Sequence, residues 1–116
     1  MKNQPKLYLK LYQLIKFLYA SKKNFPKEYK YTIGNDMMVL AWQCLDIFLE
    51  ANSLPNNEKK SKIMELSVAF DKLKMRLRMG QELRLISEKQ FAHIQTNYNS
   101  EIGNMIGGWS KWTAEI

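Results

Sequence analysis

Residues 57–84 read NEKKSKIMELSVAFDKLKMRLRMGQELR, and apolar side chains recur in this stretch at steps of three and four residues. That spacing places them along one face of an α-helix, whereas a half-buried strand would alternate polar and apolar residues. The stripe consists of Ile63, Leu66, Phe70, Leu73, Leu77 and Gly80. The sequence therefore predicts a long amphipathic helix over about 57–84.

Three further segments show the same spacing, and turn signals separate all four. Asn24-Phe25-Pro26 ends the first segment, and the polar run 52–57 ends the second. The third ends at Leu85-Ile86-Ser87, where Ser87 and Gln90 have the spacing of a capping box. The predicted helices cover about 5–23, 26–52, 57–84 and 87–113.

Four helices joined by short connections predict an all-α fold, an antiparallel up-down-up-down four-helix bundle. The length of the chain is that of a single domain spanning 1–116. The predicted helix 26–52 carries a second apolar row at Met38, Trp42, Leu45 and Leu49. A helix that is apolar on two sides needs two neighbours, and we expect Trp42 and its row to meet another subunit of a homo-oligomer.

The net charge of +7 resides entirely in residues 1–31, which hold eight lysines and one acidic side chain, because residues 32–116 hold ten basic and ten acidic ones. A cationic face on a folded domain indicates an anionic partner, either nucleic acid or an acidic protein surface. A solvated face without a partner is the structural alternative. The candidate contacts are Lys16, Lys22, Lys23, Lys27 and Lys30, with Tyr29 and Tyr31 on either side of Lys30, and Lys74, Arg76, Arg78 and Arg84.

Catalytic signals are nearly absent, and we predict that the protein is not an enzyme. His93 is the only histidine and lies beside the core stripe of the last helix, where a structural role is expected. Cys44 lies on a core stripe without a partner base and is expected to be a small buried hydrophobe. The sequence contains neither a phosphate-binding glycine loop nor a Glu-x-x-His pair, so it predicts no catalytic residue, metal site or cofactor.

A single cysteine fits a reducing compartment, and lysines interrupt the N-terminal apolar run. We therefore expect a cytoplasmic protein with neither a signal peptide nor a membrane span. In one alternative, helix 5–23 lies on an anionic membrane with its lysines toward the headgroups.

The segment 101–109 reads EIGNMIGGW and places three glycines inside an otherwise periodic helix. Each glycine costs about 1 kcal/mol relative to alanine in a helix, so this concentration calls for a reason. Gly103 and Gly107 lie on one face, where another backbone or a bulky ring can approach; the alternative is that the helix breaks here. We assign Gly103, Gly107, Gly108 and Trp109 to helix packing or to an oligomer contact.

Three motifs together resemble the Avd family, the accessory variability determinants of diversity-generating retroelements. They are FPKEYKY at 25–31, LKMRLR at 73–78 and the glycine-rich segment above, and the similarity covers roughly residues 14–112. The resemblance implies a four-helix bundle that assembles as a homopentameric barrel with a positively charged surface. It also implies an accessory role in which the barrel binds the element's reverse transcriptase and its template RNA or cDNA.

When the motifs of the family are matched to this sequence position by position, the resemblance assigns the basic run of the family to Lys74, Arg76 and Arg78. Its packing segment falls on Glu101, Gly103, Gly107, Gly108 and Trp109. The lysine density before residue 24 is a feature of this chain and is not implied by the family.

The expected function is thus a non-catalytic scaffold that binds nucleic acid and a reverse transcriptase in a diversity-generating retroelement. Reversal of Lys74, Arg76 and Arg78 to glutamate is expected to abolish RNA binding and to leave the fold intact. The alternative is a protein of the related four-helix-bundle family encoded by intervening sequences in bacterial large-subunit ribosomal RNA genes, with a structural or ribosome-linked role. A neighbouring reverse transcriptase gene favours the first function, and a location inside a ribosomal RNA gene favours the second.

Overall fold

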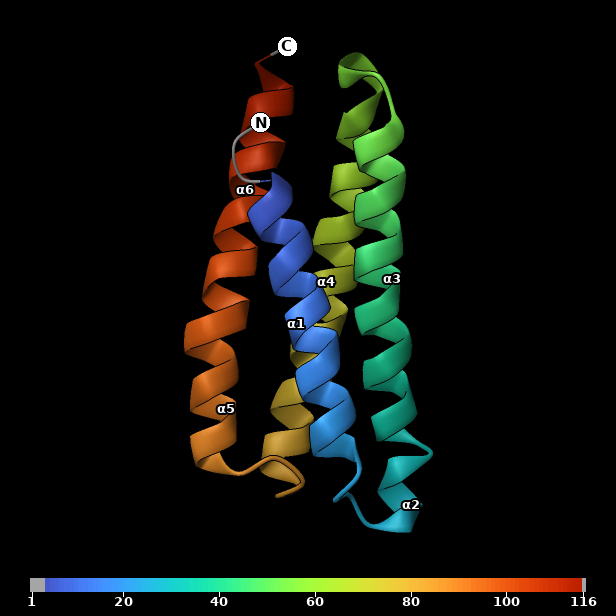
Figure 1. Ribbon diagram of the computed structural model, residues 1–116, viewed down its shortest axis with the longest axis vertical. Coiled ribbons are helices and arrows are strands. Elements are labelled where there is room, and N and C mark those ends of the chain that lie inside the picture. Colours follow the sequence, from blue (N-terminus) through green and yellow to red (C-terminus); the bar gives the residue numbers. More distant parts are fainter. Residues whose placement is uncertain (1–3, 116) are drawn as a thin grey trace.

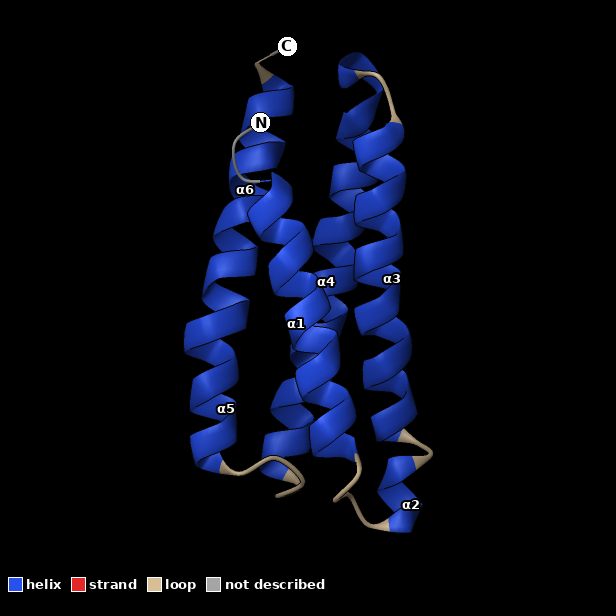
Figure 2. Ribbon diagram, in the orientation of Figure 1, coloured by secondary structure: helices blue, strands red, loops and turns tan. Residues whose placement is uncertain are grey.

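The computed structural model describes residues 4–115, with side chains placed from Lys6 onward. In this range the secondary structure is helical and contains no strand, and the molecule measures 47 × 23 × 19 Å along its principal axes. Figure 1 shows four long rods lying side by side, and Figure 2 shows that the loops lie at the two ends of the bundle. Lys2, one of the eight N-terminal lysines, lies outside the described residues.

The first three rods are single helices, and the fourth is composite. They are α1 (Gln4–Lys22), α3 (Ile33–Ser53) and α4 (Lys59–Glu82), followed by α5 (Glu88–Ile94), the π-helical turn η2 (Gln95–Asn99) and α6 (Ser100–Ala114) in one line. A one-turn helix α2 (Lys27–Lys30) precedes α3, and a 3-10 turn η1 (Asn56–Glu58) precedes α4. Successive rods run in opposite directions (Figure 1), which agrees with the predicted all-α class and antiparallel four-helix arrangement.

The order of packing around the bundle is α1, α3, α4 and the last rod, with α1 closing the circle against α6. The predicted stripes point inward: Leu7, Leu11, Leu14 and Leu18 of α1 are buried, as is the whole stripe of α4. Trp109 is fully buried, with its ring centroid 5.5 Å from that of Phe48. Burial of such apolar surface is the main favourable term in folding, at about 25 cal/mol per Å².

The predicted single helix over 26–52 is wrong, because the chain forms α2 and α3 with a break at Tyr31 and Thr32. The hydroxyl of Thr32 donates to the carbonyl of Glu28 at 2.7 Å, which is the acceptor that the Thr32 amide would use in a continuous helix. That amide instead donates to the Tyr29 carbonyl at 3.3 Å. The helix restarts when the Asp36 amide donates to the Thr32 carbonyl at 3.0 Å.

A buried lysine closes the turn between α3 and α4. Lys59 is only 4 % exposed, and its ammonium group donates to the carbonyls of Ala51, Asn52 and Leu54 at 2.8, 3.1 and 2.6 Å. These acceptors are carbonyls at and just beyond the C-terminus of α3, where the regular helical amide donors run out; the Ala51 carbonyl also accepts from the Leu54 amide at 3.2 Å. Burial lowers the pKa of Lys59, whereas three carbonyl acceptors and the negative end of the helix dipole favour the charged form.

The last rod begins with the predicted capping box, since the Gln90 amide donates to Ser87 Oγ and the Ser87 amide donates to Gln90 Oε1, both at 3.0 Å. At η2 the backbone widens, and Lys10 Nζ of α1 donates to the Asn97 carbonyl at 3.1 Å. Lys10 also forms an ion pair with Glu101 at 2.7 Å. α6 continues through Gly103, Gly107 and Gly108 to Ala114, so the alternative of a helix break at the glycines is wrong.

Candidate nucleic-acid interface

One end of the bundle gathers cations from three separate segments. The end of α1 supplies Lys22 and Lys23, α2 supplies Lys27 and Lys30, and the α4–α5 loop supplies Arg84, all at the same end in Figure 1. We call these five residues the turn-end cluster. None of the five forms an ion pair with a carboxylate in the described part of the chain, although Glu28, Glu82 and Glu88 belong to the same end. Their positive charge is therefore not neutralised by an ion pair within the described residues.

Lys22 is held in place by two contacts that the sequence did not reveal. Its ammonium group donates to Asn35 Oδ1 at 2.7 Å and lies 5.7 Å from the ring centroid of Tyr31, which is 61 % exposed. Gly34 makes room for this arrangement, because a Cβ there would lie 3.3 Å from Lys22 Cγ and 3.1 Å from the Tyr29 carbonyl. The result is an ordered cation next to an exposed aromatic ring, a combination suited to unpaired bases.

Arg84 lies in the left-handed region of backbone conformation, with φ of 63°. The Arg84 amide donates to the Gln81 carbonyl at 2.9 Å, and the amides of Leu85 and Ile86 donate to the Gly80 carbonyl at 2.8 and 3.2 Å. This pattern is a helix C-terminal cap, in which glycine is the favoured residue. An arginine there is strained by about 1 kcal/mol, and its side chain is exposed.

We expect Arg84→Gly to be about 1 kcal/mol more stable than Arg84→Ala, because glycine adopts positive φ without a clash of its own Cβ. Both variants lack the guanidinium group, so they should weaken RNA binding to the same degree. Urea unfolding compares their stabilities, and gel-shift titration compares their affinities. Equal stabilities would contradict the strained backbone at this position.

The basic run of α4 is divided by the geometry of the helix, because residues two positions apart point to different sides. Lys74 and Arg78 line one depression with Phe91 and Gln95 of the last rod, whereas Arg76 lies outside it. Lys74 forms an ion pair with Asp71 at 3.2 Å, and Arg78 Nε lies 3.9 Å from Glu82 Oε1. Arg76 Nη1 donates to the Lys72 carbonyl at 3.3 Å. Two of these three cations are thus partly neutralised by neighbours.

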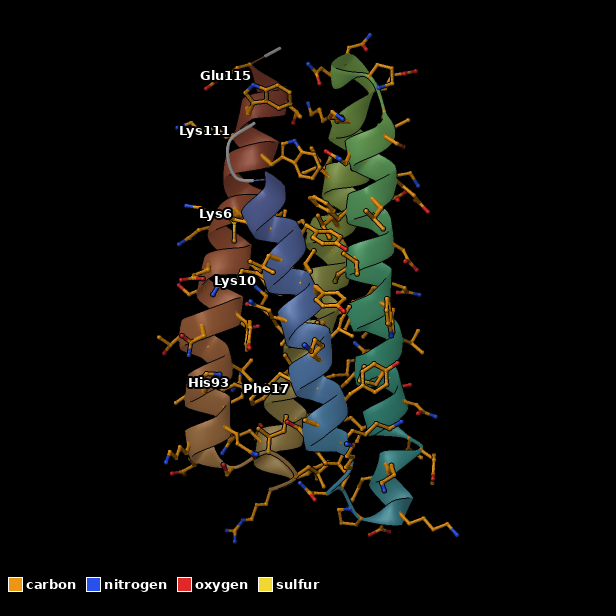
Figure 3. All side chains as sticks on the ribbon, in the orientation of Figure 1. Lys6, Lys10, Phe17, His93, Lys111 and Glu115 are labelled. Atoms are coloured by element: carbon orange, nitrogen blue, oxygen red, sulfur yellow. The ribbon has the colours of Figure 1, made fainter. Side chains whose placement is uncertain are left out.

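Lys16 lies apart from the turn-end cluster, on the exposed side of α1, with its ammonium group 5.8 Å from the ring centroid of Tyr12. Lys10 lies on the side of α1 that faces the last rod (Figure 3), where it pairs with Glu101. The described N-terminal lysines therefore lie on different surfaces of the bundle. Lys10 faces the last rod, Lys16 lies on the exposed side of α1, and the turn-end cluster holds the largest group, Lys22, Lys23, Lys27 and Lys30.

The residues assigned to packing fall into two groups. Trp109 belongs to the core of the subunit, and a Cβ on Gly103 would lie 3.8 Å from Phe70, which is an ordinary contact. A Cβ on Gly107 or Gly108 would meet nothing within 4 Å, so these two glycines make no close approach inside the subunit. Trp42 is 40 % exposed, and its Nε1 donates to the hydroxyl of Tyr19 at 3.0 Å.

Cys44 and His93, the two side chains considered for a chemical role, lie in surroundings typical of structural residues. Burial raises the pKa of Cys44 to about 12, so its thiol is protonated at neutral pH. His93 is exposed, with its ring 5.2 Å from that of Phe17 (Figure 3) and its Nδ1 2.7 Å from Asn97 Nδ2. In residues 4–115 no three His, Cys, Asp or Glu side chains are placed to hold a metal ion. None of the helices described is long and apolar enough to cross a membrane.

Comparison with known proteins gives one result. The model of the bAvd-like family matches residues 7–113, which is nearly the whole chain. No curated protein and no solved structure matches the chain. The match covers all four rods of the bundle, including both motifs of basic residues and the glycine-rich segment. The chain therefore belongs to the bAvd-like family.

Proposed function

We propose that the protein is a non-catalytic accessory subunit of a diversity-generating retroelement, in which it binds nucleic acid and the reverse transcriptase of the element. The observation that carries the nucleic-acid part is the turn-end cluster, in which cations from α1, α2 and the α4–α5 loop lie at one end of the bundle without ion-pair partners among the described residues. Membership of the bAvd-like family supports the accessory role. The proposal includes a cytoplasmic location and a homo-oligomer, with five subunits implied by the family resemblance.

The mechanism is electrostatic. Lysine and arginine neutralise phosphates and release condensed counterions, so the affinity for single-stranded nucleic acid falls with a log–log salt slope of about −0.7 for each phosphate contact. A homo-oligomer repeats the turn-end cluster once in each subunit, which raises the local concentration of binding sites along one strand. The exposed ring of Tyr31, beside Lys22, adds a stacking surface for unpaired bases.

The basic run of α4 contributes less than the turn-end cluster in this proposal, since Asp71 and Glu82 already pair with two of its cations. Lys16 lies on a different side of the bundle. The glutamate triple variant at Lys74, Arg76 and Arg78 remains a useful comparison, because its effect measures the share of helix α4 in RNA binding.

The test is co-purification of the tagged full chain, expressed together with the reverse transcriptase encoded beside its gene and the RNA of that element. We expect both the polymerase and the RNA in the eluate at low salt, with the RNA lost as salt rises. A tagged protein that retains neither the reverse transcriptase nor the RNA at low salt would overturn the proposal. Light scattering of the purified chain checks the oligomer, and a monomer would contradict that part.

A further inference from the structure

Two adjoining sides of the bundle expose apolar side chains that the described residues leave uncovered. The first, which we call the aromatic face, lies between α1 and α3. It consists of Tyr8, Tyr12, Tyr19, Trp42 and Leu49, each between 40 and 49 % exposed. A patch of this kind on a small domain is typical of a protein contact, because Tyr and Trp are enriched in interfaces.

The second side, which we call the methionine groove, lies between α3 and α4. Its apolar lining includes Ile47, Met64 and Val68, of which Met64 is 56 % and Val68 is 53 % exposed. Three carboxylates line it as well, those of Asp46, Glu50 and Glu65, against one cation, Lys72. Glu50 and Glu65 share Lys62 as an ion-pair partner, at 3.0 and 3.1 Å, while Asp46 forms no ion pair within the described residues.

The chemistry of the two sides is complementary. α1 contains no acidic residue, and Lys16 projects from it beside Tyr12. The groove offers the flexible side chain of Met64 and the apolar surface of Val68 to aromatic rings, and it offers carboxylates to a lysine. The aromatic face also includes Leu49, and a leucine side chain provides no π-face for a nucleic-acid base. A protein partner therefore fits the face better than nucleic acid does.

The two sides also lie at the same height along the bundle. The aromatic face reaches from Tyr8, whose ring centroid lies 6.3 Å from that of Phe48, to Tyr19, which accepts a hydrogen bond from Trp42. The α3 lining of the groove runs from Gln43 to Glu50, which is the same part of that helix. Two copies related by rotation about an axis parallel to the bundle, without a shift along that axis, can therefore place the face of one against the groove of the other. A closed ring requires such a relation.

We propose that the aromatic face of one copy packs into the methionine groove of a second copy, head to tail, with Lys16 directed toward the groove carboxylates. The contact rests on the homo-oligomer of the proposed function and specifies which surfaces form it. It is heterologous, so each subunit uses its face toward one neighbour and its groove toward the other. The turn-end cluster stays outside the contact and remains free to bind nucleic acid.

The test uses two variants, each disabled on one side only. Tyr12→Glu places a carboxylate on the face, and Met64→Lys places an ammonium group in the groove, so each meets a like charge across the contact. Each variant alone is expected to be a folded monomer by circular dichroism and multi-angle light scattering. Their mixture is expected to assemble, because the intact face of the Met64→Lys chain meets the intact groove of the Tyr12→Glu chain, and further extension is possible only where Glu at position 12 of one chain meets Lys at position 64 of another.

Met75→Lys is the matched control, since Met75 is 60 % exposed on the same helix but lines the depression on the side of α5. It should assemble like the unaltered chain.

A mixture that stays monomeric, a Met64→Lys variant that still dimerises, or a wild-type monomer would each overturn the head-to-tail contact. Loss of affinity for single-stranded RNA by Tyr12→Glu, with assembly unchanged, would overturn it too and would identify the face as a base-stacking surface. RNA binding by the turn-end cluster is measured on its own variants, so the two proposals fail separately.

Discussion

Reversing Lys23, Lys27 and Lys30 to glutamate should reduce the affinity for single-stranded RNA by about a hundredfold or more at roughly 0.1 M salt, because three phosphate contacts become repulsive. The fold should persist, since Lys23 and Lys27 are exposed, Lys30 is half-buried, and none of them forms an ion pair in the described structure. The log–log salt slope should become shallower by about two, at about 0.7 for each phosphate that the variant no longer neutralises. Fluorescence anisotropy over a salt series measures both quantities.

The control for this variant lies at the opposite end of the bundle. Lys6, Lys60 and Lys111 are exposed lysines near the starts of α1 and α4 and the end of α6, and their reversal changes the net charge by the same amount. We expect it to weaken RNA binding only slightly, through long-range electrostatics that salt screens. Equal decreases in affinity for the two triple variants would show that net charge alone governs binding and would contradict a localised site.

Replacing Lys59 with methionine should lower the free energy of unfolding by about 3 kcal/mol, since the variant lacks the charge-assisted hydrogen bonds to the carbonyls of Ala51, Asn52 and Leu54. Methionine fills similar space but donates no hydrogen bond, so the Asn52 and Leu54 carbonyls lose the ammonium donor and the Ala51 carbonyl keeps only the Leu54 amide. For a domain of this size, the decrease corresponds to a fall in melting temperature of roughly 10 °C. Thermal denaturation at one fixed protein concentration is the measurement, because assembly makes the melting temperature depend on concentration.

Lys60→Met is the matched control, as it makes the same chemical change one residue away at an exposed position. Its expected effect is within about 0.5 kcal/mol, the usual range for surface substitutions. If Lys59→Met were as stable as Lys60→Met, the buried ammonium group would not be what closes the turn between α3 and α4.

The helices were predictable because their apolar spacing is regular and the core takes up the same stripes. Leu66, Leu73 and Leu77 are buried as their spacing indicates, and the capping box at Ser87 forms as predicted. The break between α2 and α3 was not predictable from periodicity, since it depends on which donor occupies the Glu28 carbonyl. The side-chain hydroxyl of Thr32 occupies it, and a propensity scale does not describe that competition.

The candidate site was predictable in part. Lys22, Lys23, Lys27 and Lys30 are close in sequence, so their proximity in space follows from the first turn of the chain. Arg84 lies at the same end because α1 and α4 run in the same direction, with the antiparallel α3 between them in sequence (Figure 1). Its positive φ and the support of Lys22 by Asn35 depend on tertiary geometry. The burial of Lys59 is likewise a tertiary effect, since it requires three carbonyls at one helix end.

The most direct test of the turn-end cluster is ultraviolet cross-linking of the full chain to a single-stranded RNA that contains 4-thiouridine, followed by mass spectrometry of the peptides. We predict cross-links within residues 22–31, above all at Tyr31, which is 61 % exposed beside Lys22, and within residues 83–89. Cross-links confined to Tyr8, Tyr12 or the C-terminal part of α6, with none in those two segments, would contradict nucleic-acid binding at this end of the bundle.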